Sequence, residues 1–406
     1  MRVLFLTLGG VERVSSRGIY TDLMREFRDR GDSLYVVCPV ERRLNRPTEL
    51  AIDDGVHVLR VKTGNITKTN LLEKGLSTVL LEFQIKAAIK RYLSRVKFDL
   101  IIYSTPPITF ERVVRYVKSR DACRTYLLLK DIFPQNAVDL GMMKASGPVY
   151  RYFRAKEKRL YALSDWIGCM SEANVRYLLA HNPEIPPEKV EVCPNSISPL
   201  PLSSLGQRKQ ETRDAWGIPR EAVVMVLGGN LGKPQGLDFL LRALDRMKNR
   251  TDLFFLIIGS GTEYSRIEAH LRAGERKNAR LVAMLPKDQY DSLLCECDIG
   301  LILLDPRFTI PNFPSRLTAY MEAAKPVIAA TDTATDVGEV LTKSGSGLWV
   351  KNGDLDGFEA AVNQLAANPN LRREMGLRGR AYLEKHYTVS RAYDIITAHF
   401  REHSEG

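Results

Sequence analysis

The residues best suited to chemistry follow a short apolar run in the second half of the chain. Residues 222–227 have the length of a strand, and a glycine-rich segment, Gly228–Gly232, separates them from apolar residues at helical spacing that begin at Leu237. This order leaves bare backbone N–H groups and a helix N-terminus at the carboxyl end of the strand, which suits a phosphate. Lys233 adds a positive charge. The pattern is neither G-x-G-x-x-G nor a P-loop, so an ordinary tight turn between strand and helix stays open as the alternative.

A second glycine turn lies near the start of the chain. Residues 3–8 predict a strand, and Gly9 and Gly10 follow it directly. A polar loop then leads through Arg17 to Gly18, where a helix is predicted to begin. The N-terminus of that helix makes this second turn a further candidate for contact with a diphosphate.

Both halves of the chain alternate strands with helices, which predicts parallel, doubly wound sheets. The predicted strands are 3–8, 34–38, 100–103, 125–129, 166–170 and 190–193, then 222–227, 253–258, 280–284, 299–304, 326–330 and 347–350. We therefore expect an α/β protein with two Rossmann-like domains facing a cleft. Because ligands of parallel sheets bind where strands end, three loops of the first half are candidates: 9–18, 104–107 and 130–136.

The length of 406 residues is too great for one core and indicates two domains of roughly 200 residues. Residues 195–205 are rich in Pro, Ser and Gly and form the best linker. We predict an acceptor-binding domain at 1–198 and a nucleotide-sugar-binding domain at 199–388. The remaining residues, 389–406, hold a last helix that is expected to cross back onto the first domain.

The positive charge is concentrated in the first half. The net charge is +11, and residues 1–200 hold 32 Lys and Arg against 22 Asp and Glu, whereas residues 201–406 hold 27 against 26. Two segments, 76–97 and 149–160, interleave basic with apolar or aromatic residues. They are either surface helices packed on the sheet or a surface that lies on anionic lipid. Nucleic-acid binding is disfavoured because no known reader motif accompanies the charge.

Several other classes of protein and site are disfavoured. No apolar run reaches the ~18 residues that span a bilayer, and the N-terminus reads as a strand and not as a signal peptide, so a cytosolic location is expected. The six cysteines are predicted to be free and buried, because Cys295 and Cys297 lack a partner pair for zinc. The acidic pairs Asp53–Asp54 and Asp354–Asp356 are interpreted as solvated helix starts, so no metal site is predicted.

Five segments carry a resemblance to a known family. The chain resembles a glycosyltransferase of the GT-B fold, in retaining family four, and within it the branch that makes O-antigen and capsule sugars on a lipid carrier. The run around Asp131 and the glycine turn after residue 227 are the segments most specific to that branch. The five segments are 9–10 with 18–37, 127–142, 164–174 with 189–197, 228–241 and 308–332.

The resemblance implies roles for individual residues. Lys233 and Arg316 would stabilise the charge that grows on the leaving diphosphate. Asp131 is the carboxylate best placed to assist the transfer, and the alternative is that it caps or orients the turn that follows it. Further donor contacts are expected from Gly10, Arg17, Gly18, Gly229, Asn230, Gly232, Gln235, Gly259, Leu285, Asn312, Phe313, Ser315 and Glu322. Acceptor contacts are expected from Ser104, Thr105, Gln135 and Asn136.

The chain departs from the family's pattern at the donor sugar. Two glutamates that the family separates by seven intervening residues fall on Pro311 and Ala319 here. Glu322 lies one turn beyond Ala319 and is the candidate to replace the ribose contact, while Asn312 or Thr309 would accept the sugar hydroxyls. The histidine that many relatives place under the donor sugar is also absent.

The resemblance thus implies a retaining transferase, peripheral on the inner face of the cell membrane, that needs neither cofactor nor metal. It would move a sugar, an N-acetylated amino sugar by our expectation, from a UDP donor to a polyprenyl-diphosphate-linked or other glycan acceptor. An anionic membrane surface is an expected partner. Two alternatives stay open: a nucleotide-sugar epimerase of the same fold, and a non-catalytic nucleotide-sugar-binding scaffold.

Overall fold

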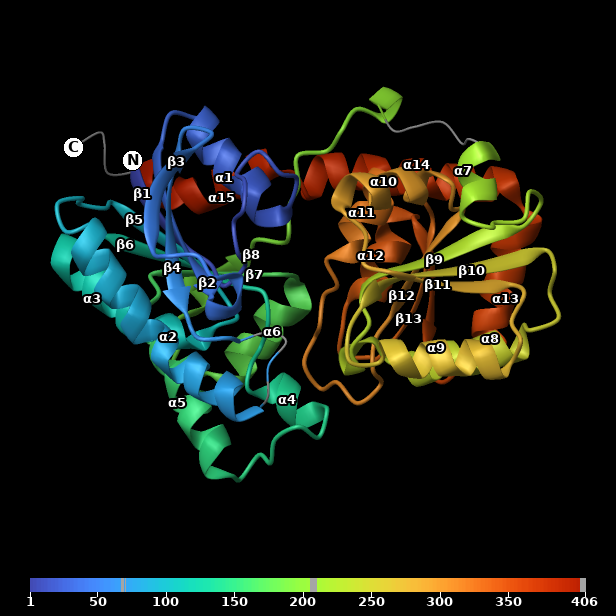
Figure 1. Cartoon of the computed structure of the whole chain (residues 1–406), viewed down its shortest axis with the longest axis horizontal. Coiled ribbons are helices and arrows are strands. Elements are labelled where there is room, and N and C mark those ends of the chain that lie inside the picture. The colour runs from blue at the N-terminus through green and yellow to red at the C-terminus, as the bar shows by residue number, and fades with distance from the viewer. Residues whose placement is uncertain (67–68, 70, 205–209, 402–406) are drawn as a thin grey trace. The chain divides into compact units, whose positions relative to one another are not determined.

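The computed structural model describes residues 1–66, 69, 71–204 and 210–401. The chain divides into two compact units, an N-terminal unit of Met1–Ser198 with Val389–Gly406, and a C-terminal unit of Pro199–Thr388. Figure 1 shows helices on both faces of a central sheet in each unit. The predicted fold class, two Rossmann-like α/β domains, is confirmed.

The N-terminal unit is built on an eight-stranded sheet in the order β3-β4-β2-β1-β5-β6-β7-β8. All its strand pairs are parallel except β3 with β4. The apolar runs form the central strands because both faces of a parallel sheet are covered by helices. The strands are β1 Arg2–Leu6, β2 Ser33–Glu41, β3 Glu49–Asp53, β4 Val56–Thr63, β5 Leu100–Ser104, β6 Arg124–Leu129, β7 Trp166–Cys169 and β8 Val190–Val192.

The hairpin of β3 and β4 was not predicted from the sequence. Asp54 and Gly55 both have positive φ and make the tight turn between the two strands. The interpretation of Asp53–Asp54 as a helix start is therefore wrong. Ile52 is 70% exposed on this edge strand, and such a short strand with one solvated face carries little apolar signal.

Helices cover both faces of this sheet. Side chains of β1 and β2, including Phe5 and Val36, form one core with Phe27 and with Ile396 of the last helix. The predicted helix within 76–97 begins earlier and ends at Tyr92. The helices are α1 Ile19–Asp29, α2 Leu71–Tyr92, α3 Glu111–Asp121, α4 Gln135–Asp139, α5 Pro148–Leu163, α6 Glu172–His181 and α15 Val389–Arg401, with short 3-10 helices at Arg42–Leu44, Ile108–Phe110 and Pro187–Lys189.

The last helix, α15, belongs to the N-terminal unit and packs beside α1. The Tyr393 ring lies 4.7 Å from the Phe27 ring, centroid to centroid, in an edge-on contact. The Tyr393 hydroxyl donates to Asp32 Oδ2 over 3.0 Å. Val389 begins the helix, and its N–H bonds the Ile197 carbonyl over 3.0 Å. These contacts hold the C-terminal segment against the first half of the chain.

The C-terminal unit has a six-stranded parallel sheet in the order β11-β10-β9-β12-β13-β14. Its strands are β9 Val223–Asn230, β10 Leu253–Ser260, β11 Ala279–Ala283, β12 Ile299–Leu303, β13 Val327–Thr331 and β14 Gly347–Lys351. Its helices are α7 Gln210–Ala215, α8 Leu237–Arg246, α9 Tyr264–Ala273, α10 Lys287–Cys295, α11 Arg316–Glu322, α12 Val337–Ser344, α13 Leu355–Ala367 and α14 Pro369–His386, with short 3-10 helices at Leu202–Ser204 and Lys233–Gln235. The strands that follow β9 in sequence, β10 and β11, lie on one side of it, and β12, β13 and β14 lie on the other. The glycine turn at the end of β9 is therefore at a topological switch point, where doubly wound sheets bind ligands.

Candidate functional site

The glycine turn of the C-terminal unit brings two strand ends into close contact. Gly229 has φ +106°, which favours glycine. A Cβ at Gly259 would lie 1.9 Å from the Gly229 carbonyl oxygen, and one at Gly261 would lie 2.4 Å from the Leu231 backbone. The ends of β9 and β10 can approach this closely only because these residues lack side chains. The Leu231 N–H donates to the Ser260 carbonyl over 2.9 Å, so the expectation that the N–H groups of this turn are all bare is wrong.

The helix that follows the turn does not begin directly after the glycines. A 3-10 helix, Lys233–Gln235, comes first, and α8 starts at Leu237. Gly236 connects the two with φ +57°, and a Cβ there would lie 2.7 Å from the Leu304 carbonyl oxygen. Lys233 is exposed, whereas Gln235 is buried and its Oε1 has no hydrogen-bond partner among the described residues.

Arg316 is the charged group that the structure places at this turn. Its Nη2 lies 3.5 Å from the Asn230 carbonyl oxygen. Its Nη1 is buried and has no hydrogen-bond partner within the described part of the chain. Burial lowers the pKa of Arg316, and only Tyr320 and Tyr290 act against that shift. A buried guanidinium without a carboxylate is costly, and its free donors suit a diphosphate.

Two tyrosines lie beside Arg316 below the turn. The Tyr320 hydroxyl donates to the Val226 carbonyl over 3.0 Å and accepts the Gly228 N–H over 3.2 Å. A Cβ at Gly228 would lie 2.2 Å from the Tyr290 hydroxyl oxygen. Glycine at this position therefore leaves the space that Tyr290 fills. These contacts fix the end of β9 and surround Arg316 with aromatic rings and not with acids.

Other predicted donor residues lie on the neighbouring loops. Asn312 and Phe313 precede α11, and the Asn312 carbonyl accepts the Thr335 hydroxyl over 2.8 Å. The Phe313 ring is buried against Tyr387. Ser315 is exposed immediately before Arg316, and Leu285 lies between β11 and α10. The structure thus gathers Gly229, Asn230, Gly232, Gly259 and Arg316 at one turn, with Gln235 buried behind it and Asn312, Phe313 and Ser315 in the segment that leads to α11.

Glu322 is a correction to the sequence analysis. It ends α11, whereas Arg316 begins it, so its side chain is at the opposite end of the helix from the turn. Glu322 is buried, and its Oε1 accepts the Leu200 N–H over 2.9 Å. Arg380 bonds the Glu322 carbonyl over 3.0 Å and also the Leu200 carbonyl. Glu322 therefore anchors the start of this unit and is not placed to contact a ribose at the turn.

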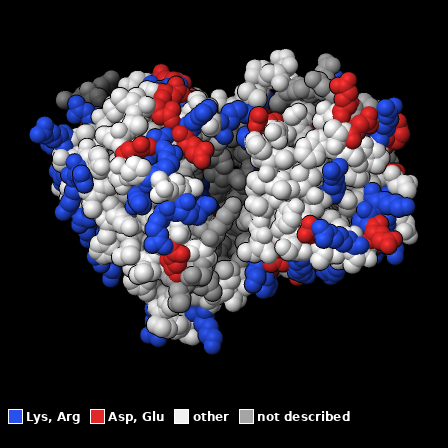
Figure 2. All heavy atoms as spheres, viewed as in Figure 1, with Lys and Arg blue, Asp and Glu red and all other residues white. Residues whose placement is uncertain are grey.

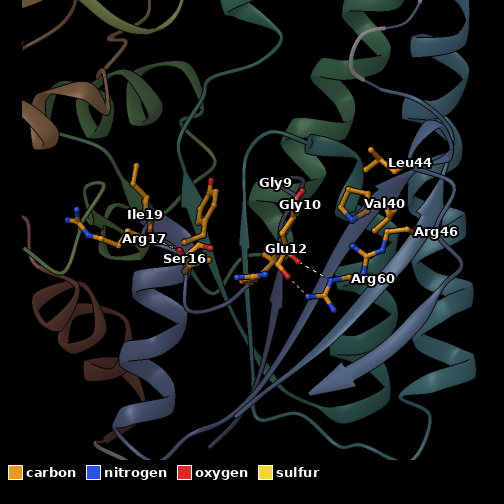
Figure 3. Close-up of a pocket in the computed structure, with 16 residues that line it drawn as sticks. Gly9, Gly10, Glu12, Ser16, Arg17, Ile19, Val40, Leu44, Arg46 and Arg60 are labelled. Atoms are coloured by element: carbon orange, nitrogen blue, oxygen red, sulfur yellow. Dashed lines mark hydrogen bonds between the residues drawn. The ribbon is translucent and has the colours of Figure 1, made fainter. Parts of the chain in front are cut away.

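The glycine turn of the N-terminal unit borders a pocket of about 440 Å³. Figure 3 shows Gly9 and Gly10 in its middle, Arg46 and Arg60 on one side, and Arg17 extending away on the other. Arg60 is buried and bonds the carbonyls of Val11 and Glu12 over 3.0 and 2.8 Å, which supports the loop from below.

The N-terminus of α1 is occupied by the protein itself. The Gly18 N–H donates to Asp22 Oδ1 over 2.9 Å, so that predicted donor group already has a partner. Asp22 also bonds Arg25 over 2.6 Å and the Ser198 N–H over 2.9 Å. Asp22 thus connects the start of α1 to Ser198, the last residue of the segment Met1–Ser198 of this unit.

The loop after β6 holds Asp131 without a partner. No side-chain bond of Asp131 is found within the described residues, and burial raises its pKa to about 6. The interpretation that its carboxylate caps the following turn is therefore wrong. Thr105 fixes the loop instead, because its Oγ1 accepts the N–H groups of Lys130 and Asp131 over 3.0 and 3.2 Å and donates to the Asp131 carbonyl over 3.0 Å.

The predicted acceptor residues fall into two groups, those whose side chains are hydrogen-bonded within the protein and those whose side chains are not. Thr105 is fully buried and used by the loop, so it is not available to an acceptor. Gln135 donates through Nε2 to Asp139 over 2.8 Å. In contrast, Ser104 Oγ and Asn136 Oδ1 are buried with no hydrogen-bond partner in the described segments. Ser104 and Asn136 therefore remain candidates.

Two residues near Asp131 were missed by the sequence analysis. Burial lowers the pKa of Lys130 to about 8, and no acid lies among the groups that act on it. Burial raises the pKa of Tyr20, Ser104 acts against that rise, and the charge of Asp131 adds to it. The signals in the sequence were the Lys immediately before Asp131 and the Tyr two residues after Gly18, but neither pattern showed that these side chains are buried.

The two basic segments differ in their exposure. Lys156 on α5 is buried and contacts Glu82 over 2.8 Å and Glu111 over 3.2 Å, so it is not a surface charge. On α2, four large apolar side chains are exposed beside basic ones, and Figure 2 shows Lys and Arg spread over this part of the N-terminal unit. The exposed residues are Leu76, Val79, Leu80 and Phe83.

The remaining sequence motifs are structural. Asp354 accepts the Gly357 N–H over 2.8 Å and caps α13, as predicted for a helix start. The six cysteines are free, and Cys295 is the one that is not fully buried. Within the described residues no group of three metal-binding side chains gathers. No described helix is both long and apolar enough to span a membrane.

Two solved structures have the same fold over nearly the whole chain. Sucrose-phosphate synthase from Thermosynechococcus elongatus aligns with a TM-score of 0.76 at 15% identity, over 99% of this chain and 98% of that one. Anabaena HepE in complex with UDP and glucose aligns with a TM-score of 0.69 at 15% identity, over 99% of each chain.

The sequence is similar to two named glycosyltransferases and matches two glycosyltransferase family models. A probable glycosyltransferase of Pseudomonas aeruginosa, WbjE, is 23% identical over 286 residues, which are 69% of this chain and 68% of that protein. A putative colanic acid biosynthesis glycosyl transferase of Escherichia coli, WcaI, is 25% identical over 45% of this chain and 41% of its own. Residues 8–199 match Glycosyltransferase Family 4, and residues 208–382 match Glycosyl transferases group 1. Because these two matches take one unit each, the chain belongs to the family 4, group 1 glycosyltransferases, which have the GT-B fold.

Proposed function

We propose that the chain is a retaining, metal-independent glycosyltransferase that transfers a sugar from a UDP donor to a lipid-linked glycan in cell-surface polysaccharide synthesis. The observation that carries the donor part is Arg316, whose buried Nη1 has no partner among the described residues and whose Nη2 lies at the glycine turn. Neighbours of the same fold include HepE in complex with UDP-glucose, which supports UDP as the nucleotide.

The proposed chemistry follows from where charge develops. As the bond from the anomeric carbon to the phosphate oxygen breaks, negative charge grows on the departing diphosphate. Arg316 supplies donors that are already in place at this turn, which is the arrangement that stabilises such charge most effectively. Lys233, exposed in the same loop, adds a second cation. In a front-face transfer the leaving phosphate accepts the acceptor's proton, and Asp131 assists by orienting that hydroxyl.

The sugar is proposed to be an N-acetylated amino sugar. Pro311 and Ala319 occupy the positions where the family's glutamates would bind sugar and ribose hydroxyls. The site therefore lacks two carboxylates that would accept hydrogen bonds from the hydroxyls of a simple hexose donor. The Asn312 side chain offers an amide that matches an acetamido group. Titration with UDP-glucose and UDP-N-acetylglucosamine tests this: tighter binding of the acetylated donor is expected, and equal affinity would contradict it.

Arg316→Met tests the donor site through two readouts of opposite sign. Loss of charge-assisted bonds to the diphosphate, about 1.5–3 kcal/mol, raises the UDP Kd about 10–150-fold. The same change removes an uncompensated buried charge, so the ligand-free protein becomes more stable. Isothermal titration with UDP and thermal unfolding measure both effects. Arg242→Met, an exposed arginine on α8, is the matched control and leaves both unchanged. An Arg316→Met protein that still binds UDP with native affinity would remove the basis of the donor proposal.

The membrane part of the proposal rests on α2. Its exposed Leu76, Leu80 and Phe83 form an apolar strip, and Lys86 and Lys90 lie 5.2 and 5.1 Å from the Tyr116 ring centroid beside it. Such a helix binds anionic lipid through both its apolar side chains and its charges.

Vesicle co-sedimentation with phosphatidylglycerol tests this surface. Each cation near the surface contributes about 1 kcal/mol, so the double change Lys86→Glu and Lys90→Glu lowers the partition constant by well over 30-fold. Arg272→Glu with Lys277→Glu, exposed in the C-terminal unit, is the control. Equal loss in both double variants would show a general charge effect and no lipid surface on α2.

A further inference from the structure

Strand β9 loses its main-chain partner on one side before it reaches the glycine turn. It pairs with β10 along its whole length, from Val223 to Asn230. With β12 it pairs, among the described residues, at Met225 and Val226 alone. Backbone groups of β9 beyond that point need other partners on the β12 side, because unpaired backbone N–H and C=O groups are costly in the interior.

The Tyr320 hydroxyl takes the place of main-chain pairing where the two strands separate. It accepts the Gly228 N–H over 3.2 Å. It lies 3.0 Å from the Val226 carbonyl oxygen and 3.2 Å from that of Leu301, and donates toward both, so it connects β9 to β12. A Cβ at Gly300 of β12 would lie 2.4 Å from the Tyr320 ring. Glycine at that position therefore leaves the space that the ring occupies.

Arg316 contacts the same edge of β9 at the glycine turn. The backbone groups of successive strand residues point to opposite sides, so those of Val226, Gly228 and Asn230 point to one edge. Arg316 Nη2 lies 3.5 Å from the Asn230 carbonyl oxygen. Tyr320 follows Arg316 by one turn of α11, so the two side chains lie on one face of that helix. The helix thus contacts β9 twice, through the phenol before the turn and through the guanidinium at the turn.

The guanidinium itself has little else in the protein to hold it. No acidic side chain pairs with Arg316 in the described structure, and its Nη1 has no hydrogen-bond partner there. An arginine side chain has many rotamers, and fixing them costs free energy. The place of its donors therefore depends on how far α11 lies from the end of β9, and the bonds of Tyr320 set that distance.

We propose that Tyr320 is a positioning residue of the donor site, which acts through Arg316 by holding α11 at a fixed distance from the end of β9. This inference rests on the proposed transferase function, because it takes a nucleoside diphosphate to be the ligand of Arg316. Tyr320 is fully buried and does not touch the ligand. It keeps the Arg316 donors where charge develops on the leaving diphosphate, and donors fixed in advance stabilise such charge best.

Tyr320→Phe keeps the ring beside Gly300 and removes the hydroxyl. Isothermal titration of this variant compares UDP with uridine, which lacks the diphosphate. The UDP Kd is expected to rise about 3–10-fold, the size of one hydrogen bond, while the uridine Kd stays unchanged. Equal weakening of both ligands would show a general effect on the unit, and a native UDP Kd would show that Arg316 needs no such support. Either result would overturn the proposal.

A double-mutant cycle with Arg316→Met separates positioning from a structural role. Tyr320→Phe should change the UDP Kd of the Arg316→Met protein by less than about 2-fold, and a full effect in that background would contradict the proposal. Asp298→Asn is the matched control, because the Asp298 carboxylate accepts the Val224 N–H over 2.9 Å at the other end of the same edge of β9. That variant should lower the free energy of unfolding and leave the UDP Kd unchanged.

Amide hydrogen exchange of the wild-type protein provides a measurement that needs no variant. UDP should slow exchange of the Gly228 N–H about 10-fold more than uridine does, because a diphosphate bound to Arg316 stabilises the contact of α11 with β9. Equal slowing by the two ligands would overturn this inference and leave the donor proposal standing. A wild-type protein that does not bind UDP would overturn the proposed function, and this inference with it.

Discussion

Replacing Asp131 with Asn is expected to make the protein more stable, and the gain should depend on pH. Burial raises the pKa of Asp131 to about 6, and no described side chain or N–H bonds its carboxylate. The folded state therefore holds the proton more tightly than the unfolded chain does. Stability from this group is complete below pH 4 and is lost as the pH rises through about 6. The neutral amide of Asn removes that loss.

The magnitude follows from the two pKa values. With an unfolded value of about 3.9 and a folded value of about 6, ionisation costs the folded state about 1–2 kcal/mol at pH 5 and about 2–3 kcal/mol at pH 8. Asp131→Asn should therefore raise the free energy of unfolding by those amounts. Above pH 7 the difference in unfolding free energy between wild type and Asp131→Asn should be constant, because Asp131 is then ionised in both the folded and the unfolded wild-type protein.

The tryptophans allow this to be measured on one unit. Trp166 is in β7 of the N-terminal unit, stacked 4.5 Å from the His399 ring, whereas Trp216 and Trp349 belong to the C-terminal unit. In a Trp216→Phe, Trp349→Phe background, urea unfolding followed by fluorescence reports the N-terminal unit alone. The midpoint and slope at pH 5, 6, 7 and 8 then give the free energy at each pH.

A paired aspartate provides the control. Asp165 accepts the Thr125 N–H over 2.9 Å and Lys118 over 2.8 Å. Asp165→Asn should destabilise the unit by about 1–3 kcal/mol at every pH, since it weakens bonds that exist. If Asp131→Asn destabilised the unit in the same way, or its effect did not change between pH 5 and 8, then Asp131 would have a structural partner and the reasoning would be refuted.

Three further changes test other parts of the structure. Gly261→Ala places a methyl 2.4 Å from neighbouring backbone and should lower both the UDP affinity and the melting temperature of the C-terminal unit; native UDP titration would show that the turn can relax. Gly75→Ala, in open space on α2, should stabilise the N-terminal unit by about 0.5–1 kcal/mol in urea unfolding, and destabilisation would contradict the exposed position. Lys156→Met leaves Glu82 and Glu111 unpaired in the interior and should cost about 3–5 kcal/mol in the same assay, whereas a neutral effect would indicate that water replaces the amine.

The parallel core was predictable from the sequence, and the hairpin at its edge was not. Strands such as residues 100–104 and 253–260 are buried on both faces, so their composition is apolar throughout and their signal is strong. In contrast, β3 has one solvated face, with Leu50 and Ile52 exposed. A five-residue strand of this kind is recognised only through its pairing with β4, and pairing is not a local property.

The site was predictable where chemistry depends on the backbone. Glycine is required at Gly259 and Gly261 by close approach and at Gly229 by its positive φ. Arg316 was assigned from its type and the segment that contains it. Glu322 and Thr105 were assigned wrongly because their partners are distant in sequence: Glu322 bonds Leu200, and Thr105 bonds the backbone of Lys130 and Asp131. Which polar residues are already satisfied is decided by tertiary contacts, so sequence alone overestimates the number available to a ligand.

Stability and function should therefore respond in opposite directions at the residues that bind substrate. Arg316 and Asp131 are charged, largely buried, and without an oppositely charged partner in the described residues. A fold selected for stability alone would pair such groups or replace them, and unexplained violations of that rule mark functional positions. Lys156 is more deeply buried than either residue but has two carboxylate partners, so its removal lowers stability. The sign of the stability change thus separates the two classes: neutralising Arg316 or Asp131 should raise stability while binding falls. A loss of stability at either residue would mean that the structure, and not a substrate, retains its charge.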